Sequence, residues 1–261
     1  AAFHGYNFLL ARENLIDHLP LDQRKNKIRE RLLKIRAKKV IIATGSLERP
    51  LIFDNNDRPG IFLSSAVKKY ADFFGVACGE KNVLFTNNDS AYETALSLFQ
   101  KGINVEAIID NREDIDSKLI KETEKNNIKV YKGYTVVNTF GYKRINKISI
   151  MQLSKDGQKV VGSKTSIDCD CLGISGGWTP AVHLFTQSGG KLKFREEDQV
   201  FIPDKYPSDQ ISLGSCNGDF TLDEILSNIS NRLKKFLDIK KTDYENLEVQ
   251  SSFNKSKRNI W

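Results

Sequence analysis

The segment 81–110 constrains the fold more than any other part of this sequence. A short apolar run at 81–85 (KNVLF) predicts a buried strand. Residues 89–101 (DSAYETALSLFQK) predict a helix with Ala95, Leu98 and Phe99 on its inner face, ended by Gly102. A second apolar run at 105–109 ends at Asp110. Strand, tight loop, helix and strand, with an acidic residue about twenty positions on, is the layout of half a dinucleotide-binding domain.

The loop of this unit departs from the usual glycine-rich sequence. The three glycine positions of G-x-G-x-x-G hold Thr86, Asn88 and Ala91. Side chains at the first two positions obstruct the tight turn and the approach of a diphosphate. Asp89 adds a carboxylate beside the helix N-terminus, where it competes with a diphosphate for the free backbone N–H groups. We therefore expect that ordinary dinucleotide binding is lost and that Asp89 or Ser90 caps the helix.

A repurposed site is the alternative for this loop. In it, the amides of Asn87 and Asn88 would meet a flavin phosphate or a partner subunit. Asp110 stands where an acidic residue would bind an adenosine ribose, and a surviving site would favour NAD over NADP. The alternative for Asp110, which we favour, is a strand-end carboxylate that caps the following turn.

Two further stretches end in small residues, as strands do at a ligand crevice. Val40–Gly45 predicts a buried strand, and 166–175 (SIDCDCLGIS) predicts another, followed by Gly176-Gly177-Trp178-Thr179-Pro180. We expect these two strand ends to lie together at one cleft, with the residues between them looped out as a separate lobe. Cys169 and Cys171 would share one face of the second strand as buried, reduced thiols.

The remaining elements follow from periodicity and end signals. Residues 1–33 read as irregular, with a polar loop or hairpin at 22–33. Ser64 is the expected N-cap of a helix at 64–74 that Gly75 ends, and Thr221 is the expected N-cap of a helix at 222–237. The other expected elements are strands at 32–37, 129–131 and 211–214, a helix at 117–126, and a β meander at 133–168 with a turn at 156–157.

Composition excludes several functions. The 261 residues carry a net charge of +7, but no basic run is interleaved with aromatics, so we expect no nucleic-acid partner. No apolar run approaches the roughly 20 residues that span a bilayer, so we expect no membrane partner. His4, His18 and His183 are scattered, and neither a metal site nor a catalytic nucleophile is evident. The only Met is Met151, and we expect a fragment of a longer chain.

Three strings closely resemble the alpha subunit of heterotetrameric sarcosine oxidase. They are ATGSLERPLIFDNNDRPG at 43–60, VLFTNNDSAYETAL at 83–96 and SGGWTPAVHLFTQSGGKL at 175–192, and the match covers most of residues 30–236. The resemblance implies an α/β chain, namely an incomplete Rossmann-like FAD/NAD(P)-binding fold with a second Rossmann-like nucleotide-binding domain inserted. The implied segments are 1–52 (part of the first domain), 53–75 (linker turn and helix), 76–168 (inserted domain), 169–237 (return to the first domain) and 238–261 (flexible tail).

The resemblance also implies the surroundings of the chain. A glycine-rich dinucleotide unit would precede it and a folate-binding domain would follow it. NAD would lie in this subunit and FMN at the interface with a flavin-bearing beta subunit, with FAD and tetrahydrofolate elsewhere in the complex. Smaller gamma and delta subunits would complete a cytoplasmic enzyme that oxidatively demethylates sarcosine to glycine. That enzyme produces H₂O₂ and passes a one-carbon unit to tetrahydrofolate; the fragment alone would be inactive.

The first-domain site is expected at small residues near the strand ends: Ala43, Thr44, Gly45, Gly176, Gly177, Trp178, Thr179, Gly214 and Ser215. The resemblance also places the chain within the wider class of two-dinucleotide-fold flavoprotein reductases. Gly214-Ser215 falls where that class carries Gly-Asp, whose carboxylate holds a flavin ribityl chain. Ser215 lacks that charge, which favours NAD over FAD in the first domain. A second candidate nucleotide site comprises Thr86, Asn87, Asn88, Asp89, Ser90 and Asp110. Two other functions stay open for the chain. One is a subunit of a related proline or amine dehydrogenase that binds ATP or another nucleotide, and the other is a non-catalytic scaffold with vestigial nucleotide sites.

Overall fold

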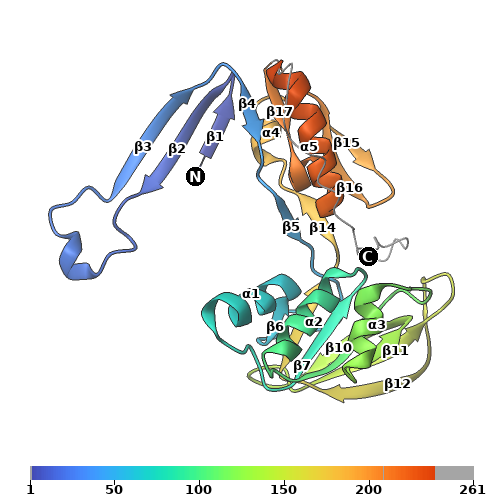
Figure 1. The fold of residues 1–261 in the computed structure, drawn as a ribbon. Coiled ribbons are helices and arrows are strands. Elements are labelled where there is room, and N and C mark those ends of the chain that lie inside the picture. The colour runs from blue at the N-terminus through green and yellow to red at the C-terminus, as the bar shows by residue number, and fades with distance from the viewer. Residues whose placement is uncertain (1, 208, 239–261) are drawn as a thin grey trace. The chain divides into compact units, whose positions relative to one another are not determined.

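The computed structural model describes residues 2–207 and 209–238 (Figure 1). The chain forms two compact units. Of the described residues, the first unit contains those through Leu47 and those from Thr179 to Asp238, and the second is Glu48–Trp178. The chain leaves the first unit along β5 (Ser46–Glu48) and returns along β14 (Trp178–Pro180), and these two strands pair with each other.

The second unit is built on a five-stranded parallel sheet with the order β6-β13-β7-β8-β9. Its strands are β6 (Ile61–Leu63), β13 (Cys171–Ser175), β7 (Asn82–Thr86), β8 (Val105–Asp110) and β9 (Lys129–Lys132). Every residue of β7 and β13 is buried, as continuous apolar runs in a sheet covered on both faces require. The predicted strand–helix–strand layout at 81–110 is confirmed.

Three helices cover one face of this sheet: α1 (Ser64–Phe74), α2 (Ser90–Gln100) and α3 (Lys118–Lys125). Leu84, Ala95 and Ile108 belong to the core cluster on this side. Phe99 is 44% exposed and its predicted place on the inner face of α2 is wrong, whereas Leu98 belongs to the core cluster as predicted.

The start of α1 also differs from the prediction. Ser64 is the first helical residue rather than the N-cap, and its hydroxyl donates to Thr94 Oγ1 over 3.0 Å. The Glu48 carboxylate accepts the N–H of Ser65 at 2.8 Å and so satisfies a free donor of the first turn. Gly75 ends the helix in the left-handed region, as predicted.

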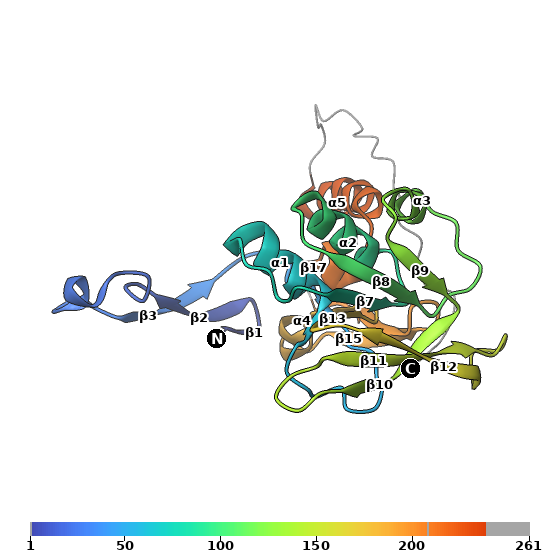
Figure 2. The same cartoon turned by 90° about the horizontal axis from the view of Figure 1, so that it is seen from below.

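The β meander predicted at 133–168 is confirmed, and it covers the opposite face of the sheet. Its strands are β10 (Tyr134–Phe140), β11 (Lys147–Leu153) and β12 (Val160–Asp168). Phe85 and Ile109 of the parallel sheet share a core cluster with Ile148 and Ile150 of β11. Figure 2 shows α2 and α3 on one side of β7 and β8 and the meander on the other.

The run 166–175 is not one strand. β12 ends at Asp168 and β13 begins at Cys171 in a different sheet. Asp170 breaks the run because its carboxylate accepts the backbone N–H groups of Glu80 and Lys81 at 3.1 and 2.8 Å. Cys169 consequently joins the core cluster on the meander side and Cys171 the one on the helix side. Both are buried and free of disulfides, but the prediction that they share a face is wrong.

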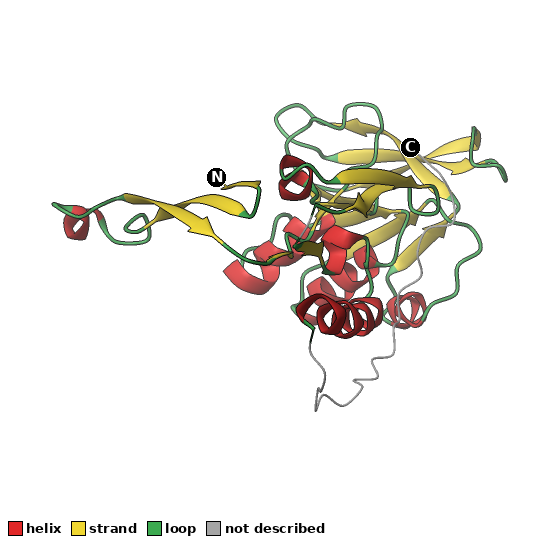
Figure 3. Cartoon of the chain, turned by 90° about the horizontal axis from the view of Figure 1, so that it is seen from above, coloured by secondary structure: helices red, strands yellow, loops and turns green. Residues whose placement is uncertain are grey.

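The first unit opens with β1 (Ala2–Gly5), β2 (Phe8–Asn14) and β3 (Glu30–Arg36), paired antiparallel, with a short 3-10 helix, η1 (Leu21–Arg24), between β2 and β3 (Figure 3). The prediction of an irregular start is therefore wrong. Tyr6 and Asn7 both take positive φ angles, 51° and 56°, which is the backbone of a tight hairpin turn. The strand predicted at 32–37 is confirmed within β3.

The rest of the first unit brings β4 (Val40–Ile42) into parallel pairing with β17 (Gln210–Ser212). The other elements are α4 (His183–Gln187), β15 (Lys191–Arg195), β16 (Val200–Lys205), the 3-10 helix η2 (Gly214–Asn217) and α5 (Leu222–Leu237). Ile42 packs with Phe185 and Cys216 in a small core, whereas Ile41 is 44% exposed. The strand predicted at 40–45 is thus shorter and less buried than expected.

The second unit is larger than the inserted domain predicted at 76–168. The compact second unit extends on both sides of 76–168, because β6, α1 and β13 contribute to its sheet and cores. The five-segment division otherwise stays a prediction, and its tail from 239 onward lies outside the described residues.

Candidate nucleotide-binding sites

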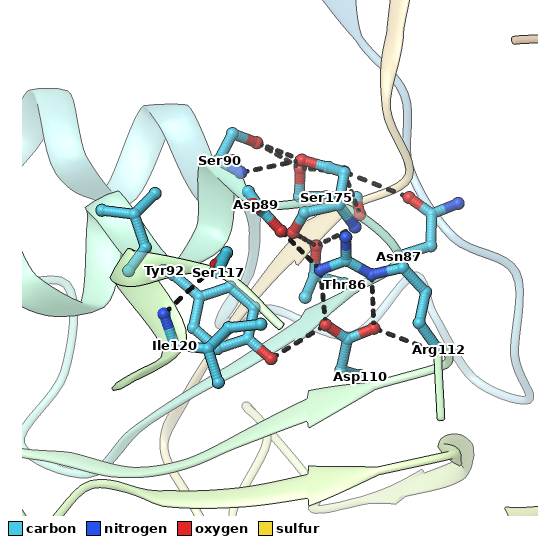
Figure 4. Close-up of polar contacts among 12 residues, drawn as sticks. Thr86, Asn87, Asp89, Ser90, Tyr92, Asp110, Arg112, Ser117, Ile120 and Ser175 are labelled. Atoms are coloured by element: carbon cyan, nitrogen blue, oxygen red, sulfur yellow. Dashed lines mark hydrogen bonds and ion pairs between the residues drawn. The ribbon is translucent and has the colours of Figure 1, made fainter. Parts of the chain in front are cut away.

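The carboxyl ends of β7, β8 and β13 form the position where the second unit would bind a dinucleotide. Thr86 and Asp110 are the last residues of β7 and β8, and Ser175 is the last residue of β13. The loop from β7 runs directly into α2, so its backbone lies at the helix N-terminus (Figure 4).

Hydrogen bonds within the unit hold this loop. Thr86 Oγ1 accepts the N–H of Asn88 at 3.0 Å and donates to the carbonyl of the same residue at 2.9 Å. The Asn88 amide donates to both the carbonyl and the hydroxyl of Ser175, each at 3.1 Å. The N–H of Asn87 donates to the same Ser175 carbonyl at 3.3 Å. At the first two glycine positions, the Thr86 side chain therefore closes the loop on itself and the Asn88 side chain ties it to β13.

The N-terminus of α2 is capped by a residue that the sequence did not indicate. Asn88 Oδ1 accepts the N–H of Ser90 at 3.0 Å. Asp89 occupies the N-cap position in helical conformation and makes no side-chain capping hydrogen bond. The expectation that Asp89 or Ser90 caps the helix is wrong, because the Asp89 carboxylate is turned toward a cation instead.

That cation is Arg112. Its Nη2 lies 2.8 Å from Asp89 Oδ1 and 2.8 Å from Asp110 Oδ2. Its Nε donates to Asp110 Oδ1 at 3.1 Å, so the guanidinium holds Asp110 with two nitrogens and bridges it to Asp89 (Figure 4). The side chain of Arg112 is 5% exposed, and both carboxylates are fully buried.

Asp110 has two more partners. Tyr92 of α2 donates its hydroxyl to Asp110 Oδ2 at 2.8 Å, and the backbone N–H of Arg112 donates to Oδ1 at 2.9 Å. The second bond is the strand-end cap that we favoured for Asp110. The four hydrogen bonds to this carboxylate all come from the second unit itself.

The electrostatics of the cluster favour its charged form. Burial alone lowers the pKa of Arg112, but the hydrogen bonds and charge of Asp110, followed by those of Asp89, outweigh burial and raise this pKa. Burial, followed by the charge of Asp110 and the hydrogen bond to it, raises the pKa of Tyr92. Arg112 therefore remains a cation and Tyr92 a neutral donor at physiological pH.

The first unit brings together a second set of predicted residues. Ala43, Thr44 and Gly45 follow β4, and Gly214 and Ser215 follow β17, so the parallel pairing sets both groups at one sheet edge. Thr44 Oγ1 donates to the Ala181 carbonyl at 2.6 Å, and Gly45 O accepts the Ala181 N–H at 2.9 Å. The segment that contains Thr179 and Ala181 is thus hydrogen-bonded to the turn at Thr44 and Gly45.

Gly176 and Gly177 have a structural role inside the second unit, where their backbone pairs with that of Arg49. Gly176 N–H donates to the Arg49 carbonyl at 2.7 Å, and Arg49 N–H donates to the Gly177 carbonyl at 2.8 Å. A Cβ on Gly176 would lie 2.8 Å from the Pro50 carbonyl oxygen, so two chain segments approach too closely for any side chain. Trp178 is half-buried at the start of β14. β13 lies between β6 and β7 in the sheet of the second unit, so the expectation that the residues between Val40–Gly45 and 166–177 form a lobe separate from both strands is wrong. The expected meeting of the two strand ends at one cleft stays a prediction.

Sequence reasoning missed three members of the second-unit cluster: Tyr92, Arg112 and Ser175. An arginine two residues after a strand-end aspartate was the available signal for Arg112, because the Asp110 side chain turns back to that position. No group of three or more His, Cys, Asp or Glu residues within 2–207 and 209–238 is arranged to hold a metal. No helix in the same ranges is long and apolar enough to cross a membrane.

A parallel sheet covered by helices on one face and by a β meander on the other, with a strand–loop–helix turn at its carboxyl edge, is the architecture of a Rossmann-like domain. The sequence model described as "Pyridine nucleotide-disulphide oxidoreductase" matches residues 14–209. The chain belongs to this family. The predicted fold class, a Rossmann-like oxidoreductase fold, is confirmed.

The resemblance to sarcosine oxidase alpha subunits is also confirmed. The alpha subunit from Corynebacterium sp. (strain U-96) is 35% identical over 212 residues, which are 81% of this chain and 22% of that protein. The alpha subunit from Rhizobium meliloti (strain 1021) is 34% identical over 192 residues, which are 71% of this chain and 17% of that protein. The chain therefore spans about a fifth of the length of these curated relatives.

Solved structures share the fold at low sequence identity. Thioredoxin reductase from T. acidophilum superposes with a TM-score of 0.60 at 16% identity, covering 91% of this chain and 71% of that one. L-proline dehydrogenase from P. horikoshii superposes with a TM-score of 0.55 at 18% identity, covering 88% of this chain and 40% of that one. These likenesses concern the fold alone.

Proposed function

We propose that this chain is the central part of a sarcosine oxidase-type alpha subunit, an NAD-holding and assembly component of an oxidoreductase complex. The observation that carries the proposal is the 35% identity over 81% of the chain to a protein named as such a subunit. In the proposed complex, sarcosine is demethylated oxidatively to glycine, O₂ is reduced to H₂O₂ and the one-carbon unit passes to tetrahydrofolate.

The proposed NAD position is the strand edge of the first unit. Gly45 and Gly214 take positive φ angles of 78° and 72°, and a Cβ on either would meet no atom within 4 Å. Backbone that is open at both strand ends fits a ligand that lies against it. Ala43, Thr44, Gly45, Gly214 and Ser215 would then contact the nucleotide, with Thr179 close by. NAD, when bound, supplies a nicotinamide that can carry hydride.

Residue 215 bears on the choice of cofactor. Ser215 is half-buried and is the second residue of η2, and its carbonyl accepts the N–H of Gly218 at 3.1 Å. The neighbouring carboxylate, Asp219, is held by the amides of Asn217 and Asn228 at 3.2 and 2.9 Å. A carboxylate aligned for a ribityl chain is thus lacking at 215, which supports NAD rather than FAD here. FMN at an interface with a beta subunit, FAD, and the gamma and delta subunits belong to the proposed complex.

The test is the nucleotide content of the full-length subunit. The purified subunit is denatured and the released nucleotide is separated and quantified. We expect about one NAD per subunit, as for a single tight site. Release of FAD or ATP instead would overturn the cofactor assignment, and release of no nucleotide would favour a scaffold in which both sites are vestigial.

A second candidate function is that of an alpha subunit in a related proline or amine dehydrogenase. The fold likeness to L-proline dehydrogenase supports this alternative only at the level of architecture. Turnover of the assembled complex separates the two, because one complex should oxidise sarcosine and the other proline. Faster turnover of proline than of sarcosine, at equal concentration, would overturn our preference.

A further inference from the structure

The nucleotide-recognition groups of the second unit are already engaged by the protein. A carboxylate offers about four acceptor positions. The four positions of Asp110 meet the Tyr92 hydroxyl, the Arg112 backbone N–H and two guanidinium nitrogens of Arg112. An adenosine ribose, which an acidic residue at this strand end would normally bind, would have to displace one of these donors.

The donors that a diphosphate would use are engaged as well. The N–H groups of Asn87, Asn88 and Ser90 donate to Ser175 O, Thr86 Oγ1 and Asn88 Oδ1 at 3.3, 3.0 and 3.0 Å. Asp89 adds a fully buried negative charge next to them. A diphosphate at this place would find these three N–H groups, including the first one of α2, already engaged and would meet a carboxylate of its own sign.

We infer that the Arg112 side chain permanently occupies the dinucleotide site of the second unit and thereby prevents this unit from binding soluble nicotinamide nucleotides. The guanidinium bridges Asp89 and Asp110 across the space between the helix N-terminus and the end of β8, where a dinucleotide would run from diphosphate to ribose. Asp89 and Arg112 act as a pair, since each neutralises the other in a buried place.

The functional consequence concerns the electron donor. A nicotinamide nucleotide from solution has no docking place in the second unit, so this unit cannot present its hydride to a flavin. The electrons of the complex must then enter at another site. This inference concerns the second unit alone and holds whichever amine the complex oxidises, so it can fail independently of the proposed function.

The experiment measures NADH and ADP-ribose binding to the full-length subunit by titration calorimetry. The test variant is Asp89→Ala/Arg112→Ala, which removes one charge of each sign and leaves Asp110 with Tyr92, as in an ordinary ribose site. The matched control is Glu124→Ala/Lys132→Ala, which removes a partly exposed ion pair of the same unit, 2.7 Å apart. We expect the test variant to bind ADP-ribose at least about tenfold more tightly than the wild type and the control.

Three results would overturn the inference. One is saturable NADH binding to the wild type beyond any resident nucleotide, competed by ADP-ribose; this measurement uses the wild type alone. Another is a test variant that keeps a cooperative thermal transition but gains no affinity for ADP-ribose. The last is an equal gain in the control, which would show that the affinity comes from general loosening of the unit.

Discussion

Arg112 holds Asp110 with two nitrogens of one guanidinium: Nε lies 3.1 Å from Oδ1 and Nη2 lies 2.8 Å from Oδ2. The two residues are only two positions apart, and both are buried. The pair therefore closes the turn after β8 and, through Asp89, fastens that turn to the start of α2.

Removing the guanidinium should destabilise the second unit strongly. Arg112→Ala leaves Asp89 and Asp110 buried without their cation, and we expect the free energy of unfolding to fall by about 3–5 kcal/mol. Urea denaturation of the full-length subunit measures the change. Lys121→Ala is the control, because the pair Lys121–Asp116 is 63% and 75% exposed and should change stability by less than about 1 kcal/mol. Equal effects in the two variants would contradict the buried network.

Tyr92→Phe should cost less and should change the response to alkali. The variant loses one hydrogen bond to Asp110, so we expect a loss of about 1–2 kcal/mol. The pKa of Tyr92 is raised in the folded state, chiefly by burial. The unfolded chain then releases this proton first, so the stability of the wild type falls as pH rises above about 10.

Unfolding free energies at a series of alkaline pH values test this expectation. In Tyr92→Phe the decline above pH 10 should be shallower than in the wild type. Tyr142→Phe is the control, since that side chain is 95% exposed. An unchanged slope in Tyr92→Phe would contradict the buried, neutral phenol.

The buried thiols of Cys169 and Cys171 should not react with thiol reagents in the native protein. Burial raises the pKa of Cys169 and of Cys171 to about 12 each, so almost no thiolate forms at neutral pH. We expect neither to react with an aromatic disulfide reagent at pH 8 until denaturant is added. Because both folded-state pKa values are raised, stability should decline above the unfolded thiol pKa of about 8.5. Rapid native labelling of either residue, identified by peptide mapping, would contradict this.

Glu48 should act as the cap of α1. Its carboxylate accepts the Ser65 N–H at 2.8 Å, where a negative charge also suits the helix dipole. We expect Glu48→Ala to lower the free energy of unfolding by about 1–2 kcal/mol and Glu48→Gln, which keeps an acceptor, by less. Thermal denaturation of the three proteins gives the order, and a glutamine variant as unstable as the alanine variant would disprove the capping role.

The sequence predicted those features that local chemistry determines. Gly75 and Gly102 end α1 and α2 because both positions take positive φ, 64° and 72°. The helix at 222–237 is confirmed, and the Glu224 carboxylate accepts the Thr221 N–H at 3.2 Å at its start. The strand–helix–strand pattern at 81–110 is equally local, which is why its elements could be read without the rest of the chain.

Features that depend on distant partners could not be predicted. The break after Asp168 depends on backbone donors of Glu80 and Lys81, almost ninety positions away. Asp89 pairs with an arginine of another loop rather than with its own helix, so capping rules alone pointed in the wrong direction. Ser175 receives the Asn88 amide only because β13 lies beside β7 in the sheet.

Arg112 belongs to the polypeptide itself and so is present in every folded copy at a fixed ratio. A domain held by a diffusible nucleotide gains stability that varies with the supply of that nucleotide. With the guanidinium in that place, the stability of the second unit should not depend on the concentration of a nucleotide. Depleting a cell of nicotinamide should therefore leave the folding equilibrium of this unit unchanged.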